Sequence, residues 1–127
     1  MGKTKDINNQ RLEFLGDRVL GLVIAEKLLT DNKKAKEGYL APQLNSLVKK
    51  ETCAEVASKI NLGPALIMSR SESSSGGRKK VAILGDAMEA ILGAIYLDGG
   101  LEAVRKIIYV LWQDAFSSVI EKSFDPK

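Results

Sequence analysis

Long stretches of apolar residues at helical spacing are the feature that most constrains the fold of this chain. Apolar side chains recur three to four positions apart along residues 9–30 and again along residues 101–122. In the first stretch they cover much of the helix circumference, which predicts burial on more than one side. The sequence contains no alternating strand pattern with a hairpin turn. We therefore expect an all-α fold, a helical bundle.

Shorter helices are expected between these two. One is predicted over residues 42–50, with Pro42 in its first turn. The next is predicted to begin near Thr52, because Thr52 and Glu55 have the spacing of a capping box. The remaining apolar segment, 81–97, lies between two groups of turn-forming residues. A Ser/Gly-rich stretch at 71–77, predicted to be a mobile loop within the domain, comes before it, and Asp98-Gly99-Gly100 follows it.

Composition limits the chain to one globular domain. Its 127 residues suffice for one domain and are too few for two ordinary ones, and 45% hydrophobic with 28% charged residues excludes a disordered or fibrous chain. No apolar run approaches the roughly 18 residues that span a membrane, and the N-terminus lacks the apolar core of a signal peptide. The single cysteine, Cys53, cannot form an internal disulfide. We expect a soluble protein of the cytoplasm.

The chain has no histidine, which excludes every mechanism that needs an imidazole base or a histidine metal ligand. The net charge of +3 does not by itself establish a polyanionic partner. Basic side chains gather in residues 33–50 and 78–80, and such runs are ordinarily solvated helix faces.

Two pairs of acidic residues stand in otherwise apolar helical segments. Glu13 and Asp17 are four positions apart and Asp86 and Glu89 are three apart, so each pair shares a helix face on which like charges repel. From its own segment alone, the second pair is best explained as an N-cap with its capping-box partner, and Gly16-Asp17 as a helix break. Taken together, the pairs indicate a site for a hard dication such as Mg²⁺, which would relieve the repulsion in both. Such a site, without histidine, favours metal-assisted attack of water on a phosphodiester.

At these residues the chain resembles ribonuclease III, the Mg²⁺-dependent endonuclease of double-stranded RNA. Arg-Leu-Glu-Phe-Leu-Gly-Asp at 11–17 is similar to the family's signature. The run Ile-Leu-Gly-Asp-Ala-Met-Glu-Ala-Ile-Leu-Gly-Ala-Ile-Tyr-Leu-Asp-Gly-Gly at 83–100 is similar to its second conserved block, and Ser75-Gly76-Gly77-Arg78 to the loop before that block. The resemblance covers nearly the whole chain. It makes metal binding, rather than capping, the expected role of Asp86 and Glu89.

The resemblance implies a homodimeric helical bundle in which each of two centres cuts one strand of duplex RNA, leaving 5′-phosphate and 3′-hydroxyl ends with two-nucleotide 3′ overhangs. It implies Mg²⁺ as cofactor, with Mn²⁺ as a substitute, and processing of ribosomal and messenger RNA. The implied site residues are Asp17 and Glu89 as catalytic groups; Glu13, Asp17, Asp86 and Glu89 as metal ligands; Glu37, Arg78 and Lys79 at the RNA; and Phe14 as an interface anchor, the other interpretation of Phe14 being an ordinary core residue.

The chain also departs from the family pattern. Gln10 stands where the family usually has glutamate. By the resemblance, we expect the family's first helix and its C-terminal double-stranded-RNA-binding domain to be absent from these 127 residues. We expect an endonuclease domain over residues 1–122 and the start of a linker over residues 123–127.

Two other functions stay open. The first is a non-catalytic RNA-binding or ribosome-associated protein on the same fold, although such a protein would be expected to lose the four acids. The second is an unrelated helical scaffold whose acids are caps, which Mg²⁺ would neither bind nor stabilise.

Overall fold

The computed structural model describes residues 2–62 and 77–123, with side chains over residues 9–62 and 80–119. Every regular element within these two stretches is a helix, which confirms the expected all-α fold. In chain order the helices are α1 (Gly2–Asp31), α2 (Glu37–Val48), α3 (Lys50–Lys59), α5 (Gly77–Leu111) and α6 (Gln113–Ser123). Within the same stretches no helix is both long enough and apolar enough to cross a lipid bilayer.

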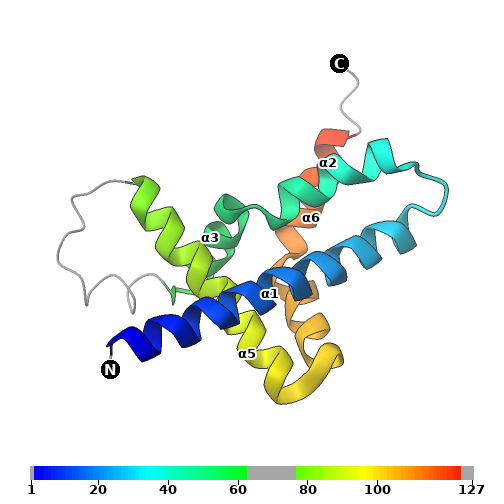
Figure 1. Ribbon diagram of the computed structural model, residues 1–127. Coiled ribbons are helices and arrows are strands. Elements are labelled where there is room, and N and C mark those ends of the chain that lie inside the picture. Colours follow the sequence, from blue (N-terminus) through cyan, green and yellow to red (C-terminus); the bar gives the residue numbers. More distant parts are fainter. Residues whose placement is uncertain (1, 63–76, 124–127) are drawn as a thin grey trace.

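The two longest helices, α1 and α5, cross near their middles, and this crossing organises the domain (Figure 1). Two glycines make the close approach possible. A Cβ atom at Gly16 would overlap the carbonyl oxygen of Glu89, and one at Gly93 would overlap the carbonyl oxygen of Leu12. The helix backbones therefore touch, and the acidic face of α1 is held beside that of α5.

The core lies around this crossing and draws buried side chains from all five helices. Trp112 separates α5 from α6 and is completely buried. Leu20, Val23 and Ile24 of α1 and Met88 and Leu92 of α5 are equally inaccessible to solvent. These residues come from the apolar stretches that predicted the helices. Burial of each such side chain stabilises the folded domain by roughly 1.5–3 kcal/mol.

The joint between α2 and α3 is tied by hydrogen bonds to the last carbonyl groups of α2, which have no partners of their own beyond the helix end. The Thr52 hydroxyl donates to the carbonyl oxygen of Ser46 at 2.6 Å, and Trp112 Nε1 donates to that of Leu47 at 2.8 Å. Cys53 Sγ makes a weaker contact of 3.8 Å with the carbonyl oxygen of Val48. These bonds fix the place where α3 begins.

Several predicted helix boundaries were wrong. Helix α2 begins at Glu37, because the amides of Tyr39 and Leu40 already bond to the carbonyl of Lys36, so Pro42 lies in the second turn. Thr52 does not cap α3, which begins at Lys50; its hydroxyl serves α2 instead.

The interpretation of Asp86 and Glu89 as a cap is also wrong, because α5 begins at Gly77, well before them. Likewise, α1 continues through Gly16 and Asp17 without a break. The expected stop at residues 98–100 is a bend within α5 at Gly100, whose φ of 84° favours glycine. The expected helix over residues 101–122 is interrupted at Trp112. The loop predicted at residues 71–77 lies almost wholly outside the described residues.

Candidate functional site

A polar hollow of about 500 Å³ opens where α1 and α5 cross beneath the α2–α3 joint. Glu13 and Asp17 of α1 line it, and so does Glu89 of α5. Its other walls are Gln10, Phe14, Val48, Lys49 and Lys50. Three of the four acids singled out from the sequence therefore share one hollow, although α1 and α5 are far apart along the chain.

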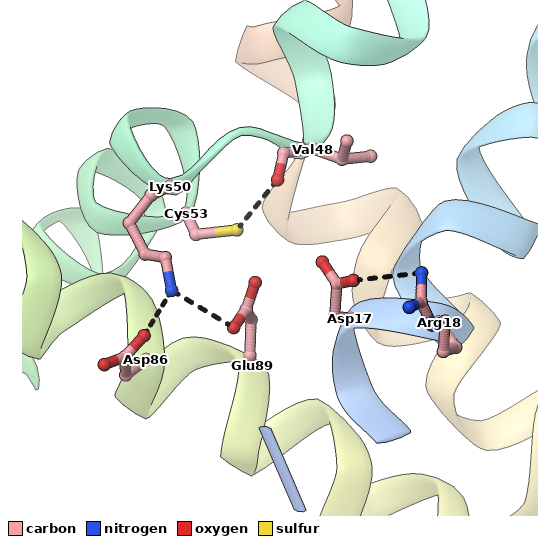
Figure 2. Close-up of polar contacts among 7 residues, drawn as sticks. All are labelled: Asp17, Arg18, Val48, Lys50, Cys53, Asp86 and Glu89. Carbon is pink, nitrogen blue, oxygen red and sulfur yellow. Dashed lines mark hydrogen bonds and ion pairs between the residues drawn. The ribbon is translucent and has the colours of Figure 1, made fainter. Parts of the chain in front are cut away.

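The fourth acid, Asp86, lies at the edge of the same site and is linked to it through Lys50. The ammonium group of Lys50 bonds to Asp86 Oδ1 and lies 3.6 Å from Glu89 Oε1 (Figure 2). On the other side, Asp17 faces Glu89, and Asp17 Oδ2 lies 3.7 Å from Arg18 Nη1. The four acids thus surround one region, but two of them share a lysine.

Glu89 is the most buried of these acids. Its side chain is only 8% exposed, against 38% for Asp86 and 42% for Asp17. Burial raises the pKa of Glu89 to about 7, with the charge and hydrogen bond of Asp17 and the charge of Asp86 adding to the effect and Lys50 opposing it. Burial, and then the charge of Asp86, also raise the pKa of Glu13. The site therefore holds more negative charge than Lys50 neutralises.

The donor chemistry of this site fits a hard dication, because all four acids offer carboxylate oxygens and one of them is almost desolvated. The arrangement is not a closed metal cage, however. Among the described side chains, no three acidic or cysteine groups stand close enough to hold one ion. Asp17 interacts with Glu89, while Asp86 is turned to Lys50. A cation bridging Asp86 and Glu89 would need the space that the ammonium takes.

The remaining predicted residues lie in different places. Phe14 is 63% exposed, with the guanidinium of Arg18 5.2 Å from its ring centre, so its interpretation as a core residue is wrong. Glu37 begins α2 and lines a separate apolar hollow with Leu28, Leu29 and Leu40, about 16 Å along the helix from Val48 at the acidic site. Arg78 and Lys79 stand in the first turn of α5, but their side chains lie outside the described part of the chain.

Sequence reasoning missed two contributions to the site. It treated Lys50 as one of a run of basic residues, because nothing in its spacing from the acids along the sequence indicates that they are in contact. It also assigned no packing role to Gly16 and Gly93, whose lack of a side chain permits the crossing. Cys53 is buried on α3, and burial raises the pKa of its thiol to about 12.

The fold and the site define an all-α domain with an acidic hollow at the crossing of its two longest helices. A family model described as ribonuclease-III-like matches residues 2–114. The chain belongs to the ribonuclease III family.

Individual relatives agree with this assignment. Ribonuclease 3 of Jannaschia sp. strain CCS1 is 55% identical over 120 residues, which are 94% of this chain and 53% of that protein. Ribonuclease 3 of Rhodobacter capsulatus is 54% identical over 127 residues, the whole of this chain and 56% of that protein. The chain therefore spans about half the length of these curated relatives.

Solved structures give the same fold. The nuclease domain of ribonuclease III from Campylobacter jejuni, in a 2.2 Å crystal structure, superimposes with a TM-score of 0.75 at 44% identity, covering 85% of this chain and 74% of that one. A second structure of that domain, described for its flexibility in a region involved in dimer formation, gives a TM-score of 0.73 at 43% identity over 91% and 76% of the two chains.

Proposed function

We propose that this chain is the endonuclease domain of a ribonuclease III that hydrolyses both strands of double-stranded RNA, in the cytoplasm, during the processing of ribosomal and messenger RNA. The observation that carries the proposal is the pairing of Asp17 and Glu89. They come from two different helices, share one hollow, and leave a nearly buried carboxylate short of positive charge. Membership of the family, with the four acids in place, supports the same conclusion.

In this proposal Glu13, Asp17, Asp86 and Glu89 hold Mg²⁺, for which Mn²⁺ can substitute. A bound dication would supply Lewis-acid activation of water and neutralise charge at the scissile phosphate. Asp17 and Glu89 act as the catalytic carboxylates. Because both belong to rigid helices that cross at Gly16, their carboxyl groups are held facing one another before substrate arrives. The products carry 5′-phosphate and 3′-hydroxyl ends and two-nucleotide 3′ overhangs.

Duplex RNA is recognised through its shape, phosphates and 2′-hydroxyls, since its major groove is too deep for side chains to read. Glu37, Arg78 and Lys79 are proposed to lie along the bound RNA. Replacing Arg78 and Lys79 by alanine should flatten the salt dependence of RNA binding. With fewer phosphate contacts, binding releases fewer counterions from the RNA. An unchanged slope would remove these two residues from the RNA-binding surface.

Duplex cleavage on both strands requires two centres, and we propose that they come from a homodimer in which Phe14 is an anchor. Phe14 supports this role because it is a large apolar side chain left 63% exposed beside the acidic hollow. The Campylobacter jejuni domain, which shares this fold, contains a region involved in dimer formation.

The test is cleavage of a defined RNA duplex in Mg²⁺ by the wild type and by Glu89→Gln, with Glu55→Gln as the control, since Glu55 is exposed on α3 away from the hollow. Glu89→Gln keeps the side-chain shape and removes the charge, so it should abolish cutting while the domain stays folded. Full activity in Glu89→Gln would refute the proposed centre. Duplex binding without cutting by the wild type would instead identify the non-catalytic RNA-binding alternative.

A further inference from the structure

Lys50 lies in the acidic site, although its place in the sequence does not predict this. It is the first residue of α3, immediately after the joint that the bonds of Thr52 and Trp112 hold in place. From there its ammonium group reaches across to α5 and contacts both Asp86 and Glu89 (Figure 2). One lysine therefore bridges the two acids that the proposed function assigns to a metal.

The methylene stem of Lys50 also packs against α5. Its methylene groups lie against α5 at Gly85, where a Cβ atom would collide with Cγ and Cδ of the lysine. Gly85 directly precedes Asp86, so the absence of a side chain there lets the lysine run along the helix surface toward the carboxylate. Gly85 thus leaves room for the methylene groups of the lysine, and Asp86 beside it binds the ammonium group.

The charge count shows what this lysine accomplishes. When both are ionised, Asp86 and Glu89 together bring two negative charges, and Lys50 supplies one positive charge. Asp17 adds a further negative charge beside Glu89. A single ammonium offsets one of these three negative charges, whereas a dication in its place would offset two.

We propose that Lys50 is an internal counter-ion that holds the acidic site together without metal, and that a divalent cation at Asp86 and Glu89 must displace its ammonium group. The inference rests on the proposed function, since it takes these acids as metal ligands. Binding of metal and pairing of Lys50 are then mutually exclusive, so Lys50 weakens the apparent affinity for the cation. If the ammonium is paired for about nine-tenths of the time, the apparent Kd is raised about tenfold.

The test is calorimetric titration of the 127-residue chain with Mg²⁺ and, separately, Mn²⁺. Lys50→Met keeps the length of the stem and removes the charge. The matched control is Lys59→Met, because Lys59 lies at the other end of α3 and makes an ordinary ion pair with Asp114 at 3.1 Å. Lys50→Arg restores a cation at the position.

We expect Lys50→Met to bind either metal with about tenfold lower Kd than the wild type, while Lys59→Met and Lys50→Arg stay close to the wild type. In EDTA the same Lys50→Met substitution should lower the melting temperature, because the acids lose their counter-ion. A merely structural lysine would not give these opposite signs, since its loss would weaken the fold and the metal site together.

A measurement on the wild type keeps the inference testable should Lys50→Met fail to fold. Acetic anhydride modifies free amines, so saturating Mg²⁺ should raise the acetylation rate of Lys50 severalfold and leave that of Lys59 unchanged, as read by mass spectrometry.

Three results would overturn the inference while the proposed function stands: equal metal affinity in Lys50→Met and the wild type, weaker affinity in Lys50→Met, or an unchanged acetylation rate of Lys50. Absence of metal binding in every variant would reject the metal site of the proposed function itself, and the inference with it.

Discussion

Replacing Glu89 by glutamine should stabilise the domain in metal-free buffer, and the gain should depend on pH. Glu89 is nearly buried, and burial together with the charges of Asp17 and Asp86 outweighs Lys50 and raises its pKa from 4.5 to about 7. The folded domain therefore holds the Glu89 proton more tightly than the unfolded chain does. Ionising this carboxyl group costs the fold free energy that glutamine, which never ionises, avoids.

The size and direction of the effect follow from the two pKa values. Each tenfold difference in proton affinity is worth about 1.4 kcal/mol, so the change from 4.5 to about 7 corresponds to about 3 kcal/mol. Below pH 4.5 both states are protonated and the full stability is present; as pH rises through 7 that stability is lost, because the native state must give up a proton that it binds preferentially. Between pH 5 and pH 8, wild type should lose about 2–3 kcal/mol relative to Glu89→Gln.

The assay is urea unfolding followed by circular dichroism at pH 5 and pH 8, in EDTA. Glu55→Gln serves as the control, because it removes the same charge from an exposed position on α3 and so subtracts any effect of net charge. The reasoning fails if wild type and Glu89→Gln show the same pH dependence, or if Glu89→Gln is the less stable protein at pH 8. Either result would mean that Lys50 already compensates the charge of Glu89.

Three further perturbations test the packing and the assembly. Gly16→Ala should destabilise the domain by about 1–3 kcal/mol or more and abolish RNA cleavage, because the new methyl group must force α1 away from α5. Gly21→Ala lies on the same helix with open space around it. In urea unfolding it should instead stabilise the domain by up to about 1 kcal/mol. Trp112→Phe should lower the free energy of unfolding by about 1–3 kcal/mol, because it leaves the carbonyl oxygen of Leu47 without its buried donor; an unchanged midpoint would show that this bond does not hold the α2–α3 joint. Phe14→Ala should raise the dimer dissociation constant at least tenfold in sedimentation analysis while hardly altering monomer stability, since the ring is 63% exposed; undiminished dimerisation would place the interface elsewhere.

Local pattern in the sequence was sufficient for the helical class and for the acidic pairs. Apolar residues at helical spacing predict α1 and most of α5 because the period is a property of the helix itself. The same geometry places Glu13 beside Asp17 and Asp86 beside Glu89, since residues three or four apart share a helix face. What these local rules could not supply is how the two faces meet.

Helix ends were the part of the fold that local rules predicted least well. Thr52 and Glu55 have the spacing of a capping box, yet Thr52 donates to the last turn of α2. Asp86 and Glu89 fit a cap equally well, yet α5 begins at Gly77. In both cases a short motif admits two structures, and the packing of neighbouring helices selects between them.

By itself the sequence determined that this chain forms amphipathic and buried helices, that two of them carry paired acids, and that no histidine takes part in its chemistry. Only the tertiary structure decided that Gly16 and Gly93 bring those helices into contact, that Glu89 becomes the nearly buried carboxylate, and that Lys50 reaches it from another helix. The physical reason is that periodicity acts over a few residues, whereas the contact between Lys50 and Asp86 spans 36 positions and exists only once the helices are packed.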